Sequence, residues 1–163
     1  MTTDRVQMDK FAETAKKYIS LVESFDQLSL GEGLSKMGVL LPELHACVMA
    51  LGGGEPEQVP DHERSDLDDR FELFSRVKEH LGEEDAYAVE LPTETDNHVL
   101  TGSLADDFVD IYYDLSTGLE LLEQQQAEKA LRKWLETFRL HWGQHLFDAI
   151  FALQSKGQAS QAS

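Results

Sequence analysis

The chain has 163 residues, of which 31 are acidic and 14 basic, so its formal net charge is −17. A charge of this size argues against nucleic acid or an anionic membrane as a partner, because both would be repelled. The macromolecular partner that this charge favours is a protein with a basic surface.

The negative charge is concentrated in the middle of the chain. Residues 55–96 hold 15 acidic and 4 basic residues, whereas residues 1–54 have a net charge of −2 and residues 97–163 one of −4. We therefore expect any partner-binding surface to lie within the acidic segment from Glu55 to Asp96. The alternative is that these charges only keep a loop-rich face solvated.

The cysteine content and the apolar runs indicate the compartment. Cys47 is the only cysteine, which excludes an internal disulfide and a cysteine-rich metal site. Residues 1–10 have no apolar stretch of the kind found in a secretory signal, and no apolar run approaches the ~20 residues needed to cross a bilayer. We expect a cytoplasmic protein.

A chain of this length can bury one self-sufficient core, which predicts a single helical domain over residues 1–154.

Four amphipathic helices are predicted in the first three quarters of the chain, each from apolar residues spaced three and four positions apart. They cover residues 9–27, 30–51, 67–81 and 104–122. Ser29 and Ser103 can cap the second and fourth helices. Pro42 predicts either a kink in the second helix or the start of a new one.

The segment between the second and fourth helices is predicted to be acidic and loop-rich over residues 55–102. Its last part, residues 83–102, loses the helical period and is predicted as mostly loop. Only Tyr87, Val89 and Leu91 alternate with small or charged residues, which permits one short extended stretch.

The last helix is predicted over residues 127–154, where one apolar stripe contains the expected core anchors Trp134 and Trp142. A tight turn at residues 123–127 lets this helix pack antiparallel against the fourth, so that the two form a hairpin at the centre of the domain. Residues 155–163 are mostly small and polar and are predicted to be a disordered tail. The predicted fold is an all-α, compact bundle of five to six helices.

Histidine and aspartate side chains gather on facing sides of this predicted hairpin. Three aspartates are spaced i, i+3 and i+7 on the fourth helix, and two histidines and an aspartate are spaced i, i+4 and i+7 on the last. Each set therefore lies on one flank of its helix. We call these six residues the polar seam: Asp107, Asp110 and Asp114 on the fourth helix, and His141, His145 and Asp148 on the last.

Two interpretations of the polar seam follow from its chemistry. In the favoured one, the aspartates accept hydrogen bonds from histidine rings or tyrosine hydroxyls and tie the helices together, so that no cofactor is bound and no residue is catalytic. In the alternative, Asp107, Asp110, His141 and His145 bind a divalent metal whose bound water serves a hydrolysis. The sequence has neither the Glu-x-x-His motif of di-iron bundles nor the His-Glu-x-x-His motif of zinc proteases.

Gly143 is the one glycine inside the predicted last helix. A glycine there costs ~1 kcal/mol relative to alanine, so a structural reason for it is expected. The close approach of a neighbouring helix is the favoured reason, and backbone access for a ligand is the alternative.

Three stretches of the C-terminal half carry a family pattern. They are Leu-Gly-Glu-Glu-Asp-x-Tyr at residues 81–87, Ser-Leu-Ala-Asp-Asp-Phe-Val-Asp-Ile-Tyr-Tyr-Asp-Leu at residues 103–115, and Trp134 followed by Phe-Arg-Leu-His-Trp-Gly-Gln-His at residues 138–145. This pattern resembles the bacterial family known as domain of unknown function 5063. The resemblance implies a compact helical domain of the bacterial cytoplasm, and it implies no activity, substrate or catalytic residue.

Two function hypotheses result. The favoured one is a non-enzymatic protein-binding module, acting as a regulator, an adaptor or an immunity-type inhibitor that engages a basic protein surface. The alternative is a small metal-dependent hydrolase with its Asp/His site between the last two helices. The expected oligomeric state is a monomer or a homodimer.

Overall fold

The computed structural model describes residues 2–52, 67–90 and 99–161. Within these ranges the protein is a helical bundle with one small β-hairpin, which confirms the predicted all-α fold class. In chain order the elements are α1 (Thr2–Glu23), the 3-10 turn η1 (Phe25–Gln27), α2 (Leu30–Ala50), α3 (Leu67–Leu81), the 3-10 turn η2 (Gly82–Asp85), β1 (Ala86–Glu90), β2 (Val99–Ser103), α4 (Leu104–Glu123), α5 (Ala127–Thr137), the π-helical turn η3 (Phe138–Trp142) and α6 (Gly143–Gln161).

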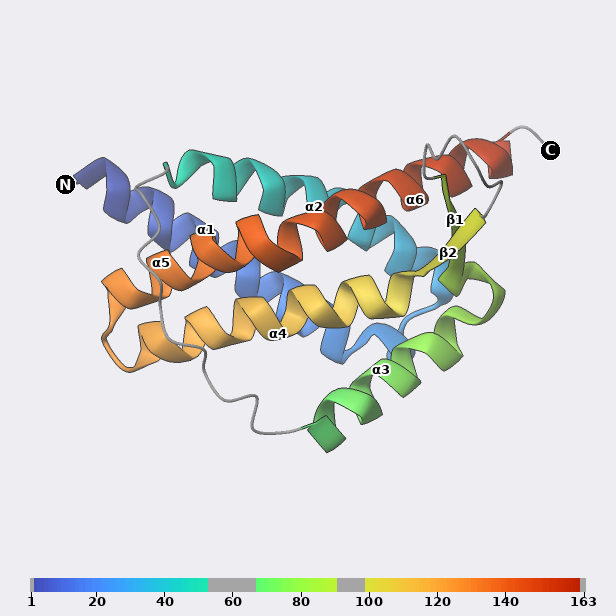
Figure 1. The fold of residues 1–163 in the computed structure, drawn as a ribbon, viewed down its shortest axis with the longest axis horizontal. Helices are drawn as coiled ribbons and strands as arrows, with labels where there is room; N and C mark the ends of the chain where they lie inside the picture. The colour runs from blue at the N-terminus through green and yellow to red at the C-terminus, as the bar shows by residue number, and fades with distance from the viewer. Residues whose placement is uncertain (1, 53–66, 91–98, 162–163) are drawn as a thin grey trace.

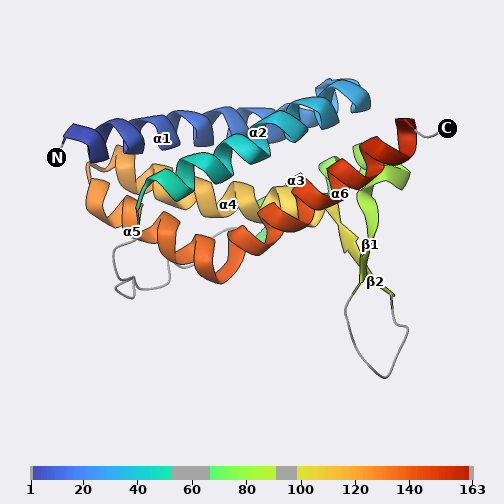
Figure 2. The same ribbon diagram turned by 90° about the horizontal axis from the view of Figure 1, so that it is seen from above.

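Helix α4 lies at the centre of the bundle and contacts α1, α3, α5 and α6. Figure 1 shows α3 on one side of α4, and α5 and α6 running antiparallel to it on the other, as the predicted central hairpin requires. Helices α1 and α2 form a second antiparallel pair that covers this hairpin (Figure 2). Their apolar faces meet in one core, whose largest fully buried side chains include Phe11, Tyr18, Phe25, Phe108, Trp134 and Trp142.

The turn between α4 and α5 is tight, as predicted, and Gln125 adopts a positive φ of 61° within it. Beyond this turn, α4 and α5 approach each other closely where Gly118 faces Trp134. A Cβ atom at position 118 would overlap the indole ring, and the indole Nε1 donates a hydrogen bond of 3.1 Å to the carbonyl of Leu115. The close helix approach that was predicted for Gly143 is therefore found at Gly118.

Helix α2 continues across Pro42 as one helix, so no new helix starts there. A proline removes the N–H that would bond the carbonyl four residues earlier, which here belongs to Gly38. Both Gly38 and Pro42 are exposed, so water can replace the missing donor. The exposed side of a helix is where this loss costs least.

The stretch predicted as mostly loop contains a second strand, β2, that was not predicted from the sequence. Strands β1 and β2 pair antiparallel, with Ala86 opposite Ser103 and Glu90 opposite Val99. The hairpin projects from the end of the bundle where α4 begins (Figure 2). The described part of the predicted loop-rich segment is thus regular structure, and its residues 55–66 and 91–98 lie outside the described ranges.

Helix α6 ends at Gln161, so the prediction of a disordered tail from residue 155 was wrong as far as that residue. Lys156 explains part of the extension. Its ammonium group donates to the carbonyl of Ala86 at 3.1 Å and lies 3.5 Å from the carboxylate of Glu84, which ties the helix to the start of the hairpin. None of the described helices is both long enough and apolar enough to cross a membrane.

Candidate functional site

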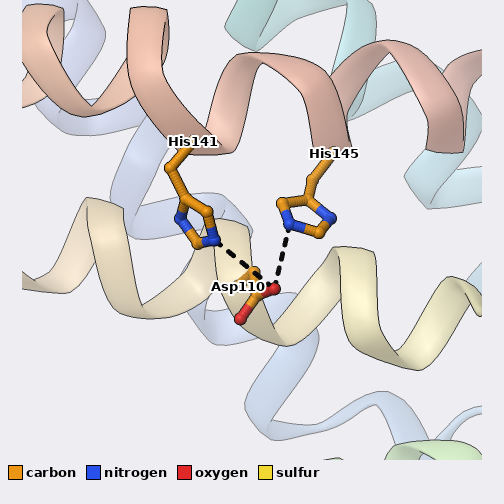
Figure 3. A group of neighbouring side chains, drawn as sticks. All are labelled: Asp110, His141 and His145. Carbon is orange, nitrogen blue, oxygen red and sulfur yellow. Dashed lines mark ion pairs between the residues drawn. The ribbon is translucent and has the colours of Figure 1, made fainter.

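Five of the six residues of the polar seam meet in the structure. The aspartates extend from α4, and the histidines extend toward them from η3 and α6; Figure 3 shows His141 and His145 above Asp110. The sixth residue, Asp148, lies one turn beyond His145 and accepts a hydrogen bond of 3.0 Å from Gln144. Asp107 and Asp110 are buried, whereas the histidine side chains stay 32% (His141) and 20% (His145) exposed.

Each histidine is held by a carboxylate of its own through Nδ1. The His141 Nδ1 lies 2.6 Å from Asp114 Oδ2, and the His145 Nδ1 lies 2.7 Å from Asp107 Oδ1. An ionised carboxylate can only accept hydrogen bonds, so the Nδ1 atom of each ring carries a proton. Both rings are thereby fixed in orientation, and each has Nε2 on its far side.

The two Nε2 atoms converge on a single oxygen of Asp110. Its Oδ2 lies 3.0 Å from Nε2 of His145 and 3.6 Å from Nε2 of His141 (Figure 3), and the second distance is too long for a hydrogen bond. Two ligand atoms bound to one tetrahedral ion at about 2.0–2.1 Å stand about 3.3 Å apart, a value between the two observed distances. The three atoms lie within 4.8 Å of one another, which is compatible with a shared metal ion.

Two residues of the site were not predicted from the sequence. Arg70 of α3 forms an ion pair with Oδ1 of Asp110, which leaves Oδ2 to the histidines. Tyr87 of β1 donates its hydroxyl hydrogen to Oδ2 of Asp107. Gly102 makes room for Tyr87, because a Cβ atom there would overlap the phenol ring. Both residues reach the seam through tertiary packing, so helical spacing carries no signal for them.

The site has a deficit of two positive charges. Asp107, Asp110 and Asp114 contribute three negative charges, of which Arg70 balances one. Two protonated imidazoles or one divalent cation would restore neutrality. Neutral imidazoles would leave two buried or half-buried charges unbalanced.

The pKa values of His145 and Asp107 are both shifted by burial and by the contact between the two side chains. Burial lowers the pKa of His145, but the hydrogen bond to Asp107 and the charges of the surrounding aspartates outweigh it, so the net shift is upward. Burial also raises the pKa of Asp107, and the hydrogen bonds from His145 and Tyr87 offset this only in part. A proton on His145 therefore competes with any metal ion for Nε2.

Comparison with known proteins bears on the fold. A family model described as "Domain of unknown function (DUF5063)" matches residues 4–157. The chain belongs to this family. The match confirms the resemblance in the C-terminal half and extends it through α1 and α2.

A solved structure shares the fold of this DUF5063 chain. The crystal structure of protein BF1032 from Bacteroides fragilis superposes with a TM-score of 0.74, covering 91% of this chain and 90% of that one at 20% sequence identity. No match was found among curated proteins.

A second set of ligand atoms, from Asp106, Asp107 and His145, also lies within 4.8 Å. It is the poorer candidate for a metal centre. Asp106 is exposed, and Asp107 already accepts hydrogen bonds from His145 and Tyr87. The set at Asp110 instead offers two imidazoles, each oriented by an outer carboxylate, which is the arrangement found around protein-bound metals.

Proposed function

We propose that the protein binds a divalent transition-metal ion through His141, His145 and Asp110. The convergence of the two Nε2 atoms on Asp110 Oδ2 carries this proposal. A seam that only joined α4 to α6 would need one hydrogen bond from each histidine, and the Nδ1 atoms already make those bonds. Neutral rings in such a seam would not need their second nitrogens to meet at one oxygen, and a protonated His141 would donate to Asp110 at hydrogen-bond distance, whereas its Nε2 lies 3.6 Å away.

The donor set indicates the kind of ion. Two imidazoles and one carboxylate suit Zn²⁺, Fe²⁺ or Mn²⁺ better than Mg²⁺ or Ca²⁺, which prefer oxygen ligands. Three protein ligands leave at least one coordination position for water, as in catalytic rather than structural zinc sites. The partial exposure of His141 and His145 gives solvent a route to that position.

The chemistry that such a centre supports best is hydrolysis. A divalent ion lowers the pKa of a bound water molecule and so supplies hydroxide near neutral pH. His141, His145 and Asp110 would hold the ion. Asp114 and Asp107 would orient the two histidine rings, and the charge of Asp110 would partly balance that of the ion. We therefore propose a small metal-dependent hydrolase, with a site between α4 and α6.

Metal analysis of protein purified without a histidine tag tests this proposal. After incubation with Zn²⁺, Fe²⁺ or Mn²⁺ and removal of free ions, we expect one ion per chain. His145→Ala should abolish stoichiometric binding, because it removes a ligand. The matched control is His45→Ala, since His45 lies in α2, its ring contacts that of Phe147 at 5.1 Å, and it belongs to neither group of candidate ligands.

Hydrolysis of p-nitrophenyl acetate and p-nitrophenyl phosphate should depend on the ion and be lost in His145→Ala. Metal binding should also weaken as the pH falls, because protons compete for Nε2. Absence of a stoichiometric ion from the wild-type protein would refute the metal centre and the hydrolase together. A bound ion with no turnover would refute only the hydrolase.

We also propose protein binding through the acidic segment from Glu55 to Asp96. A described part of that segment supports it: Leu67 and Phe71 of α3 are each 70% exposed, and the exposed acidic residues Asp68 and Glu72 stand beside them. Exposed apolar side chains with acidic residues next to them in the helix suit a partner with a basic, partly apolar surface.

Pull-down from a bacterial lysate at low and high salt tests this second proposal. We expect a partner that is retained at low salt and released at high salt, since exposed charges are screened. Phe71→Ala should weaken retention by removing the exposed apolar contact. Failure to retain any salt-sensitive partner would count against the proposal.

A further inference from the structure

The helix that carries both histidines contains a π-helical turn, η3, between α5 and α6. The N–H of Gly143 donates to the carbonyl of Phe138, five residues earlier, where an α-helix would use the carbonyl four residues earlier. This turn therefore contains one extra residue. His141 lies within it, and His145 follows in the first turn of α6.

The extra residue sets the direction in which the histidines point. At 3.6 residues per turn, adding or removing one residue rotates the following part of a helix by about 100°. The preceding helix, α5, cannot rotate freely, because the buried Trp134 packs onto Gly118 and donates to Leu115 of α4. A change in the turn must therefore move the histidines relative to Asp110.

Gly143 is the residue that makes this turn possible. A Cβ atom at position 143 would lie closer to the carbonyl oxygen of Phe138 than the 3.0 Å that real Cβ atoms keep, and 3.2 Å from the Phe138 ring. The obstructing oxygen belongs to the backbone of the same turn. It can move away only if the bond from Gly143 to Phe138 is disrupted.

We propose that Gly143 is a positioning residue of the metal centre, because it permits the π turn that directs His141 and His145 to Asp110. This inference rests on the proposed metal centre. It replaces both reasons predicted from the sequence for this glycine, since the atom that a Cβ would meet belongs neither to another helix nor to a ligand.

The test compares Gly143→Ala with Gly157→Ala. Both glycines lie in α6, but a Cβ at position 157 would meet no atom within 4 Å. The readout is the dissociation constant for Zn²⁺, measured by competition with a chromogenic chelator on protein whose circular dichroism is that of the folded wild type. We expect Gly157→Ala to bind like the wild type and Gly143→Ala to bind about 10- to 100-fold more weakly, the loss typical when a metal ligand loses its orienting support.

A second measurement uses only the wild-type protein, so it holds even if Gly143→Ala fails to fold. Binding that requires the π turn must stabilise it, so Zn²⁺ should slow hydrogen exchange of the Gly143 amide. Amides of α2, which supplies no residue to the seam, should change less, for example that of Leu44.

The outcomes separate the two proposals. If the wild type binds no stoichiometric Zn²⁺, the metal centre itself is refuted. If the wild type binds Zn²⁺, either equal affinity in Gly143→Ala or unchanged exchange at Gly143 would overturn the positioning role alone.

Discussion

Replacing Trp134 with alanine should lower the free energy of unfolding by about 3–5 kcal/mol, the usual cost of removing a large buried aromatic side chain. The indole is fully buried, its ring centre lies 4.7 Å from that of Phe11, and its Nε1 donates to Leu115. It also fills the space that Gly118 leaves open. The substitution therefore creates a cavity where α1, α4 and α5 meet, and urea denaturation followed by circular dichroism would measure the loss.

Phe151→Ala is the matched control for this prediction. Phe151 is also an aromatic residue of the C-terminal helices, but it is 69% exposed. Its replacement should change the free energy of unfolding by no more than about 0.5 kcal/mol. Similar losses for the two variants would show that Trp134 does not anchor α5 to α4.

The helices were predictable because each buries one stripe of apolar residues. The caps were predictable for a local reason as well: the Ser29 side chain accepts from the N–H of Glu32, and that of Ser103 accepts from the N–H of Asp106. Periodicity and capping depend on residues within a few positions of each other. Both signals can therefore be recognised in a single sequence.

The β-hairpin formed by β1 and β2 and the π turn η3 could not be predicted from periodicity and capping. Strand β2 is short and contains Gly102, which is unfavourable in most strands, and its role emerges only when Tyr87 of β1 lies against it. The π turn adds a single residue, and the apolar residues on both sides of it still recur three and four positions apart, so the spacing alone reads as one uninterrupted helix. Gly143 was its one visible signal, and the sequence alone could not show that the atom nearest to it is the carbonyl of Phe138.

The polar seam was partly predictable from helical spacing. Spacing placed the three aspartates and two histidines on facing flanks, and the antiparallel hairpin brought them together. Spacing could not reveal that Asp110 lies between two imidazoles while Asp107 and Asp114 orient them. Nor could it supply Arg70, which arrives from α3 and determines which oxygen of Asp110 remains for the histidines.

Replacing Asp114 with asparagine should weaken metal binding by about 10- to 100-fold, although Asp114 would not touch the ion. Its carboxylate holds Nδ1 of His141 at 2.6 Å and so keeps Nε2 directed at Asp110. Asparagine has nearly the same shape, but its neutral oxygen is a weaker acceptor, and its amide group can rotate to present a donor instead. Competition titration with Zn²⁺ would measure the change.

Asp106→Asn distinguishes orientation from simple charge loss. It removes the same negative charge from α4, but Asp106 is exposed and its carboxylate is not the partner of Nδ1 in either histidine. If the total charge near the ion sets the affinity, the two variants should lose it to a similar degree. If orientation of His141 sets it, only Asp114→Asn should. The reverse result, a loss in Asp106→Asn alone, would place the ion with Asp106, Asp107 and His145 instead. Metal affinity in these two variants therefore tests both whether the ion binds at Asp110 and how the outer carboxylates support it.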